Sequence, residues 1–210
     1  MIVDAGVIRL EGDLDLPAQA QGVVLFAHGS GSGRHSPRNR YVAQVLQQAG
    51  FATLLIDLLT AAEEAVDRQT AHLRFDIALL TKRLLGATDW LHVQTPNLRI
   101  GYFGASTGSA AALCAAAEHP DLVKAIVSRG GRPDLAGPAL ARIQIPTLLI
   151  VGAEDATVIE MNRVAMTSLP AETKLEIIPG ATHLFEEPGA LEEVARLSCH
   201  WFDRYLSPKS

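Results

Sequence analysis

The feature that most constrains the fold of this sequence is a series of short, continuous apolar runs that alternate with helical patterns. Each run is too short for a helix and is rich in residues that favour strands. A strand that is apolar at every position is typical of a parallel sheet with both faces covered. We interpret six segments, most of them largely apolar, as strands of this sheet: residues 23–28, 51–57, 98–103, 123–128, 147–151 and 174–178.

The segments between these runs carry apolar residues at helical spacing. Ser36 and Pro37 supply an N-cap and a first-turn proline for a helix that ends at Gly50. A long helix is predicted downstream, and it is marked by Leu73, Ile77, Leu80, Leu84 and Leu91. We expect further helices at residues 106–119, 159–168 and 188–206, with a small one near residues 138–143.

Strands that alternate with helices predict an α/β fold, with a mostly parallel central sheet and helices on both faces. The first twenty residues alternate between polar and apolar side chains, so residues 1–20 are expected to form a short antiparallel hairpin at one edge. A chain of 210 residues can bury one sizeable core, and we expect residues 1–210 to form a single domain. In such sheets, functional groups gather at the carboxyl ends of the strands.

The composition limits the classes of function. Apolar residues make up 48% of the chain and charged residues 20%, which is typical of a globular protein. The net charge of −5 is spread along the chain without a basic run, so we expect no nucleic-acid partner. We find no uninterrupted apolar stretch of membrane-spanning length and no pattern of a signal peptide at the start, so a cytoplasmic location is expected.

The two cysteines, Cys114 and Cys199, lie in apolar helical patterns and are predicted to be buried thiols. Neither belongs to a metal-type spacing such as CxxC, and no cluster of His, Cys and Asp has the spacing of a metal site. We therefore expect neither a metal nor a cofactor. The sequence does not indicate the oligomeric state.

A GxSxG sequence, residues 104–108, follows the central strand and opens a helix. This spacing is typical of a sharp strand-to-helix turn, in which the serine adopts strained backbone angles and its neighbours must be small. Ser106 then projects at the end of the sheet, beside N–H groups that favour negative charge. The alternatives are a tightly packed helix start and a phosphate-binding loop, but no lysine follows the final glycine as in a P-loop. We predict that Ser106 is a nucleophile.

A serine nucleophile needs a base, and His183 is the candidate among the seven histidines. It lies in a loop, residues 179–185, between the last predicted strand and the last helix, which places an imidazole over the end of the sheet. A lone loop histidine is often only solvated, but the chain order of serine, acid and histidine favours a catalytic role. Four other histidines fall in helices or near helix ends: His72, His92, His119 and His200.

The acid that orients this base should follow a strand between Ser106 and His183. Asp155 comes a few residues after the apolar run at residues 147–151, and it is our candidate, with the adjacent Glu154 as its rival. Its role would be to hold the His183 ring and to stabilise the imidazolium. The alternative is that Asp155 caps the helix that follows.

An oxyanion formed at Ser106 needs two preorganised donors. The N–H of Thr107, directly after the nucleophile, is one candidate. The other is the N–H of Ser30, with Gly31 as second choice, in the glycine-rich loop at residues 29–33. The alternative is a flexible loop without a role, but its glycines permit close backbone approach beside Ser106.

With these residues, the chain resembles the α/β-hydrolase superfamily over nearly its whole length, and it is most similar to the small, lidless, dienelactone-hydrolase-like branch. The resemblance rests on four segments: residues 27–33, 104–108, 151–158 and 179–189. It implies ester or lactone hydrolysis through an acyl-enzyme. Dienelactone hydrolases proper carry a cysteine at the elbow where this sequence has Ser106, so the dienelactone substrate itself does not follow from the resemblance.

The stretch between residues 128 and 146 is too short for the helical cap that larger relatives insert there, so we expect an open site for small substrates. Arg129 directly follows a predicted strand, and Arg34 and His35 follow the oxyanion loop. These three residues are candidates for binding an anionic substrate, because a cationic rim attracts anions. The alternative is that Arg129 pairs on the surface with Asp134 or Glu186.

Three classes of function fit these residues. The leading hypothesis is a serine hydrolase that cleaves a small carboxylic ester, lactone or thioester through an acyl-enzyme on Ser106. The second is an acyltransferase or peptidase with the same triad, which an acceptor that out-competes water would reveal. The third is a non-catalytic binding module, which would not react with a fluorophosphonate.

Overall fold

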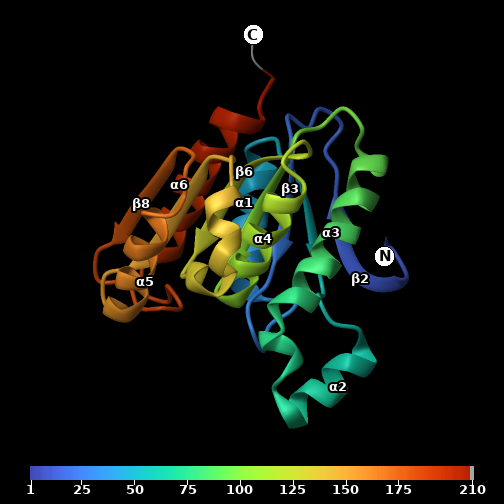
Figure 1. The fold of residues 1–210 in the computed structure, drawn as a ribbon. Coiled ribbons are helices and arrows are strands. Elements are labelled where there is room, and N and C mark those ends of the chain that lie inside the picture. Colours follow the sequence, from blue (N-terminus) through green and yellow to red (C-terminus); the bar gives the residue numbers. More distant parts are fainter. Residues whose placement is uncertain (209–210) are drawn as a thin grey trace.

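Eight strands form one sheet in the computed structural model, which describes residues 1–208 (Figure 1). Their order across the sheet is β1-β2-β4-β3-β5-β6-β7-β8. Neighbours from β4 to β8 pair in parallel, whereas β2 pairs antiparallel with both β1 and β4. The strands are β1 (Ile2–Ala5), β2 (Ile8–Asp15), β3 (Val23–Ala27), β4 (Ala52–Ile56), β5 (Ile100–Ala105), β6 (Val123–Arg129), β7 (Thr147–Gly152) and β8 (Thr173–Ile178).

Helices cover both faces of this sheet. The α-helices are α1 (Pro37–Gln48), α2 (Ala61–Thr70), α3 (Ile77–Gln94), α4 (Thr107–Glu118), α5 (Ala156–Met166) and α6 (Ala190–Leu206). Two 3₁₀ segments complete the described chain, η1 (Leu73–Phe75) and η2 (Pro133–Arg142). The predicted α/β fold with a mostly parallel sheet is therefore confirmed.

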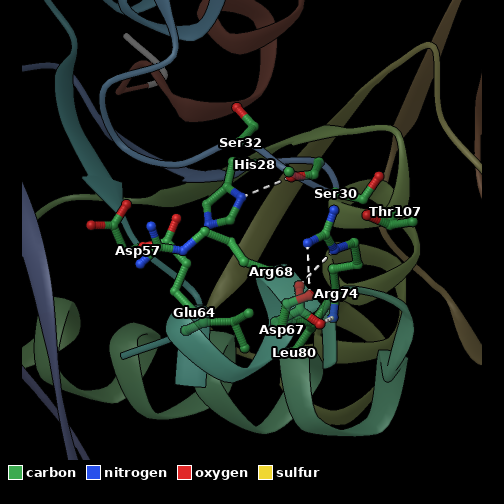
Figure 2. Close-up of a pocket in the computed structure, with 13 residues that line it drawn as sticks. His28, Ser30, Ser32, Asp57, Glu64, Asp67, Arg68, Arg74, Leu80 and Thr107 are labelled. Carbon is green, nitrogen blue, oxygen red and sulfur yellow. Dashed lines mark hydrogen bonds and ion pairs between the residues drawn. The ribbon is translucent and has the colours of Figure 1, made fainter. Parts of the chain in front are cut away.

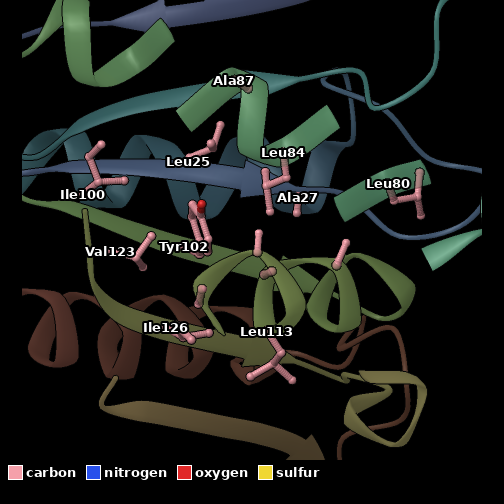
Figure 3. Close-up of a cluster of buried hydrophobic side chains, with 14 of the residues drawn as sticks. Leu25, Ala27, Leu80, Leu84, Ala87, Ile100, Tyr102, Leu113, Val123 and Ile126 are labelled. Carbon is pink, nitrogen blue, oxygen red and sulfur yellow. The ribbon is translucent and has the colours of Figure 1, made fainter. Parts of the chain in front are cut away.

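The core forms two layers, one on each face of the sheet. One layer joins the strands to α3 and α4 and includes Leu84, Leu113 and the fully buried Tyr102 (Figure 3). The other layer joins the strands to α1 and α6 and includes Leu46 and Phe202. Burial of both faces explains why β3, β4, β5 and β7 are buried at every position and consist mostly of apolar residues.

The long helix that the leucine spacing predicted is interrupted. Leu73 lies in η1, and α3 begins only at Ile77. A separate helix, α2, precedes η1, and Asp67 is its only buried residue. The helix starts with a capping box between Thr60 and Glu63, in which each side chain bonds the backbone N–H of the other residue. Because α2 has no apolar stripe, its hydrophobic pattern did not predict it.

The connection between β6 and β7 contains η2 and no cap domain, as predicted, although the small helix starts at Pro133, before the predicted residue 138. Cys114 on α4 and Cys199 on α6 are half-buried free thiols and not the fully buried ones that we predicted. Burial raises the pKa of both thiols. Within residues 1–208, no helix has the length and apolar character needed to cross a membrane.

Candidate active site

Ser106 lies at the turn between β5 and α4, with a φ of 50° and a ψ of −121°. A positive φ is strained for a residue with a side chain, so its surroundings must hold it there. A Cβ on Gly104 would stand 2.5 Å from the Ser109 Cα, and one on Gly108 would stand 2.2 Å from the Ala27 carbonyl oxygen. Close backbone approach therefore requires both glycines of the GxSxG sequence, and the turn has the geometry of a nucleophile elbow.

Backbone hydrogen bonds fix Ser106 against the end of β6. Its N–H donates to the Arg129 carbonyl at 3.2 Å, and its own carbonyl accepts from the Arg132 N–H at 3.2 Å. The same loop approaches His183, because a Cβ on Gly130 would lie 3.4 Å from Cε1 of the imidazole. One loop thus contacts both the candidate nucleophile and the candidate base.

Asp155 and His183 form a close pair. His183 Nδ1 donates to Asp155 Oδ2 at 2.6 Å. Asp155 lies at the N-cap position of α5 but makes no side-chain capping bond. Its carboxylate therefore accepts a hydrogen bond from His183 and does not cap the helix. The carboxylate side chain is 17% exposed and the imidazole 40%, so the ring is partly accessible to solvent.

The rival acid, Glu154, has a different position. Its backbone N–H donates to the Ala181 carbonyl at 3.0 Å, which ties the loop after β7 to the loop after β8. Its side chain is exposed and makes no hydrogen bond with any residue in the range 1–208. Of the two carboxylates, only Asp155 orients His183.

Between Ser106 Oγ and His183 there is no hydrogen bond in the described structure, where the imidazole is bonded to Asp155. Such bonds are commonly long in unliganded enzymes and shorten when substrate binds. Across residues 1–208, no three His, Cys, Asp or Glu side chains are grouped in a way that would hold a metal ion.

The glycine-rich loop after β3 lies directly beside the elbow. A Cβ on Gly29 would stand 3.0 Å from the Ser106 Cβ. Within the loop, the Ser32 N–H donates to the Gly29 carbonyl at 3.2 Å, whereas the N–H groups of Ser30 and Gly31 bond no atom of the described residues. Thr107 opens α4, where N–H groups have no partner in the preceding turn. These N–H groups are the candidate oxyanion donors.

His28, at the end of β3, holds this loop. Its Nδ1 donates to the Gly29 carbonyl at 2.9 Å, and its Nε2 accepts from the Leu58 N–H at 2.9 Å. Burial lowers the pKa of His28, which keeps the ring neutral and able to make both bonds. The sequence alone indicated no role for His28; in the structure, its two hydrogen bonds connect the loops after β3 and β4.

Arg129 does not lie on the rim of the site, and this prediction is corrected. The residue is only 9% exposed, its Nη2 donates to Asn39 Oδ1 at 3.4 Å, and its guanidinium lies 5.9 Å from the centre of the Phe185 ring. Burial lowers its pKa to about 10. Its side chain faces α1 and not the open end of the sheet.

The predicted surface partners of Arg129 are also engaged elsewhere. Asp134 pairs with Arg132 at 2.7 Å, and Glu186 pairs with Arg38 at 2.9 Å. The alternative reading of Arg129 as a surface ion pair is therefore wrong as well.

Arg34 is held in a cluster of acidic side chains at the hairpin edge. Its guanidinium pairs with Asp57, with Glu11 at 2.5 Å and with Asp13 at 3.7 Å. Three carboxylates offset its charge, so Arg34 is not the free rim cation that the sequence predicted. His35 is exposed, and its predicted contact with substrate stays a prediction.

Comparison with known proteins identifies the family of this chain. The family model described as the α/β hydrolase fold matches residues 22–138. A crystal structure of a dienelactone hydrolase from Anabaena variabilis is 62% identical, with a TM-score of 0.96, over 98% of this chain and 96% of that one. An α/β serine hydrolase without a lid from Xanthomonas campestris has the same fold, with 20% identity and a TM-score of 0.77 over 100% of this chain and 95% of that one.

A curated relative from Mycobacterium tuberculosis is 56% identical over 97% of this chain, and its name proposes a phosphoribosyl transferase. The chain spans 46% of the length of that relative, so the name describes a protein about twice as long. The family model and the solved structures agree on the fold of the shared half. This chain belongs to the α/β hydrolase fold family, in its lidless, dienelactone-hydrolase-like branch.

Proposed function

We propose that this protein is a serine hydrolase that cleaves a small carboxylic ester, lactone or thioester, with Ser106 as nucleophile, His183 as base and Asp155 as the acid that orients the base. The observation that carries the proposal is the Asp155–His183 pair, 2.6 Å apart, beside a serine held at positive φ. A strained serine next to an oriented imidazole is the arrangement that acyl transfer needs.

In the first half-reaction, Ser106 Oγ bonds to the substrate carbonyl carbon while its proton passes to His183 Nε2. The carbonyl oxygen becomes an oxyanion, which the N–H groups of Thr107 and Ser30, or Gly31, stabilise. The bond to the leaving group then breaks, and His183 gives its proton to that group. An acyl-enzyme on Ser106 remains.

In the second half-reaction, water attacks the acyl carbon and gives a proton to His183. The new oxyanion collapses, the bond to Ser106 Oγ breaks, and the proton returns to Ser106. Asp155 accepts from Nδ1 throughout and stabilises the imidazolium. The products are the carboxylic acid and the alcohol or thiol, and no cofactor takes part.

The proposed substrates are small. The pocket beside the oxyanion loop has a volume of about 270 Å³, and no cap domain encloses a longer chain. The support for an anionic substrate that the sequence drew from Arg129 and Arg34 is lost, because one is buried and the other is paired.

In this proposal, the phosphoribosyl transferase activity named in the relatives resides in the half of their length that this chain does not span. The shared half carries an acyl-transfer site, so the name is not carried over to this chain. The cytoplasmic location stays a prediction, which cell fractionation tests.

The test is a hydrolysis screen with nitrophenyl esters of increasing chain length, lactones and acyl thioesters. We expect turnover of short-chain substrates and its loss in Ser106→Ala. A nucleophilic acceptor added to the assay separates an acyltransferase, which would form the transfer product in preference to the acid. Absence of turnover on every class, with the protein folded, contradicts the proposal and favours a binding module.

A further inference from the structure

A pocket lies between the oxyanion loop and the segment formed by α2 and η1 (Figure 2). Ser30, Gly31 and Thr107 line one side of it, and Asp67 and Arg74 line the other. The pocket therefore adjoins the candidate oxyanion donors, and a substrate group that extends from Ser106 past these donors would enter it. The side chains on its far wall decide which substrate groups fit.

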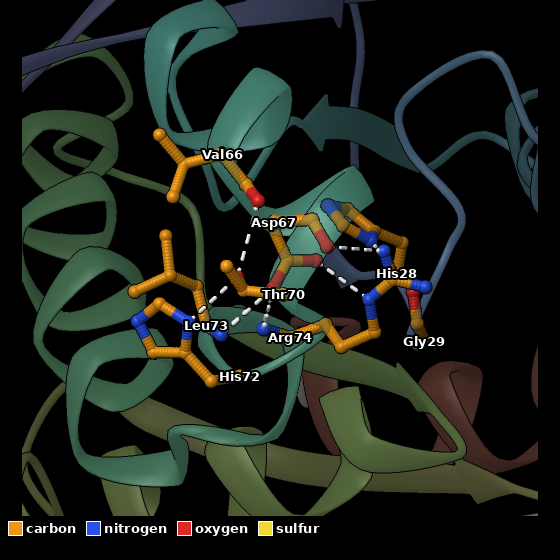
Figure 4. Close-up of polar contacts among 8 residues, drawn as sticks. All are labelled: His28, Gly29, Val66, Asp67, Thr70, His72, Leu73 and Arg74. Atoms are coloured by element: carbon orange, nitrogen blue, oxygen red, sulfur yellow. Dashed lines mark hydrogen bonds and ion pairs between the residues drawn. The ribbon is translucent and has the colours of Figure 1, made fainter.

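Arg74 is fixed on this wall by Asp67 (Figure 4). Its Nε donates to Asp67 Oδ2 at 2.6 Å, and its Nη2 donates to the Asp67 carbonyl at 2.9 Å. Asp67 Oδ1 accepts from the N–H groups of Leu73 and Arg74, at 2.7 and 3.1 Å. Asp67 is 2% exposed; burial opposes its ionisation, but the hydrogen bonds from Arg74 and Leu73 lower its pKa. The guanidinium is thus held rigidly.

The third nitrogen of this guanidinium, Nη1, is free. It makes no hydrogen bond with any atom of residues 1–208, and it lies 3.5 Å from the place where a Cβ on Gly31 would stand. Figure 2 shows the end of Arg74 directed toward Ser30 and Thr107, whereas Arg68 reaches toward Asp57. A positioned donor therefore faces the pocket beside the oxyanion loop.

The charges around the pocket indicate what this donor binds. Asp67 offsets the charge of Arg74, and Asp57 is paired with Arg34. The lining also holds Glu64 and Arg68, one of each sign, so the wall has no excess of positive charge. Recognition of a substrate group here rests on directed N–H donors, of which Arg74 Nη1 belongs to the guanidinium that Asp67 fixes, and not on a field that attracts anions. A hydrogen-bond acceptor suits that geometry, and a methyl group in the same place would leave the donor unpaired.

We propose that Arg74 is a specificity-determining residue that donates from Nη1 to a carbonyl or carboxylate oxygen on the part of the substrate that enters this pocket. The inference rests on the proposed hydrolase function, and it adds the substrate class: esters with an oxygen acceptor near the scissile bond. Asp67 is the positioning residue, because it holds the guanidinium in place.

The test compares esters that differ only by an oxygen in place of a methyl group. On the acyl side, nitrophenyl levulinate is compared with nitrophenyl isocaproate. On the alcohol side, acetol acetate is compared with isobutyl acetate. Each ratio of kcat/KM is divided by the ratio of the uncatalysed hydroxide rates, which removes the electronic effect of the keto group. We expect the wild type to prefer the keto ester about tenfold or more in one of the two pairs, because a hydrogen bond to a charged donor is lost with the other ester.

Three variants assign the preference. Arg74→Gln replaces the guanidinium, and with it the Nη1 donor, by a shorter amide, but it leaves the Asp67 carboxylate without its cation. The double variant Asp67→Asn/Arg74→Gln restores neutrality on the wall. Both should lose the preference, which is measured as the ratio of kcat/KM for the two esters of a pair. Arg83→Gln is the matched control, since Arg83 pairs with Glu63 of α2 at 2.6 Å but does not line the pocket. It should keep the preference.

The outcomes separate this inference from the proposed function. Turnover of the esters without a preference in either pair, or a preference that survives in the double variant, overturns the role of Arg74. An equal loss in Arg83→Gln also overturns it, because the effect would then come from the position of α2. No turnover of any of these esters by the wild type overturns this inference. Absence of turnover on lactones and thioesters as well overturns the hydrolase proposal with it.

Discussion

The turn that carries Ser106 and the segment formed by α2 and η1 border the same pocket, but different interactions hold them in place. The turn is fixed by backbone contact: Gly108 passes so close to the Ala27 carbonyl that a Cβ would lie 2.2 Å from it. The α2–η1 segment buries one residue of its helix, Asp67, and depends on a capping box and on ion pairs. One region is held by sterics, the other by polar side chains.

This difference separates the chemistry from the choice of substrate. The proposed reacting groups lie on strand ends and turns that the sheet positions, so changes there should affect turnover or folding as a whole. The α2–η1 wall is attached to the rest of the molecule mainly by polar contacts, so it can change its side chains without disturbing the triad. Substitutions in the two regions should therefore have effects of different size and kind.

The largest effect is expected at the nucleophile and the base. Ser106→Ala and His183→Ala should each lower kcat by about 10⁵- to 10⁶-fold with an unchanged melting temperature, because the triad acts as a unit. Steady-state assays on a short-chain ester provide the measurement. Ser168→Ala and His92→Ala, both away from the site, are the controls, and a loss in them similar to that in the triad variants would contradict the assignment.

The acid should contribute less than the nucleophile. Asp155→Asn should reduce kcat by about 10⁴-fold, because the amide no longer holds the protonated imidazole. Glu154→Gln is the matched control one residue away, and its activity should stay near that of the wild type. If the two results were exchanged, the acid would be Glu154.

The steric fixation of the elbow predicts a large cost in stability for Gly108→Ala. The added Cβ meets the backbone of Ala27, which cannot move aside, so the free energy of unfolding should fall by about 3 kcal/mol. Denaturant unfolding measures it. Gly137→Ala is the comparison: Gly137 has a φ of 50° but no atom near its Cβ position, and the expected cost is about 1 kcal/mol. Equal costs would show that backbone contact does not distinguish the elbow.

The smallest effect is expected at the start of α2. Thr60→Ala removes the capping hydrogen bond to the Glu63 N–H and should weaken the helix by about 1 kcal/mol. Since α2 packs loosely, hydrogen exchange should rise in residues 61–70 while the protection of β5 stays constant. Faster exchange throughout the sheet would mean that α2 is part of the same cooperative unit as the elbow.

The sequence predicted the sheet, the sharp turn at Ser106 and the loops that carry Asp155 and His183, because these features depend on local patterns. Continuous apolar runs identify strands buried on two faces, and GxSxG marks a turn that only small residues permit. The sequence did not predict α2, whose polar residues have no apolar period, although Thr60 and Glu63 carried the capping-box signal. It misplaced Arg129 because a position at the end of a strand does not determine which face of the sheet the side chain lies on. Nor does it indicate that α1 covers the Arg129 side chain. The role of Arg74 depends on a contact with Asp67 within an element that no hydrophobic pattern marks.

The measurement that tests the central claim most directly is labelling by a fluorophosphonate, followed by intact mass and peptide mapping. We predict one adduct per chain, located on Ser106, and none in Ser106→Ala. His183→Ala should react far more slowly than the wild type, since the hydroxyl then lacks its base. An unmodified wild-type protein, or an adduct on any other residue, would contradict the assignment of Ser106 as the nucleophile.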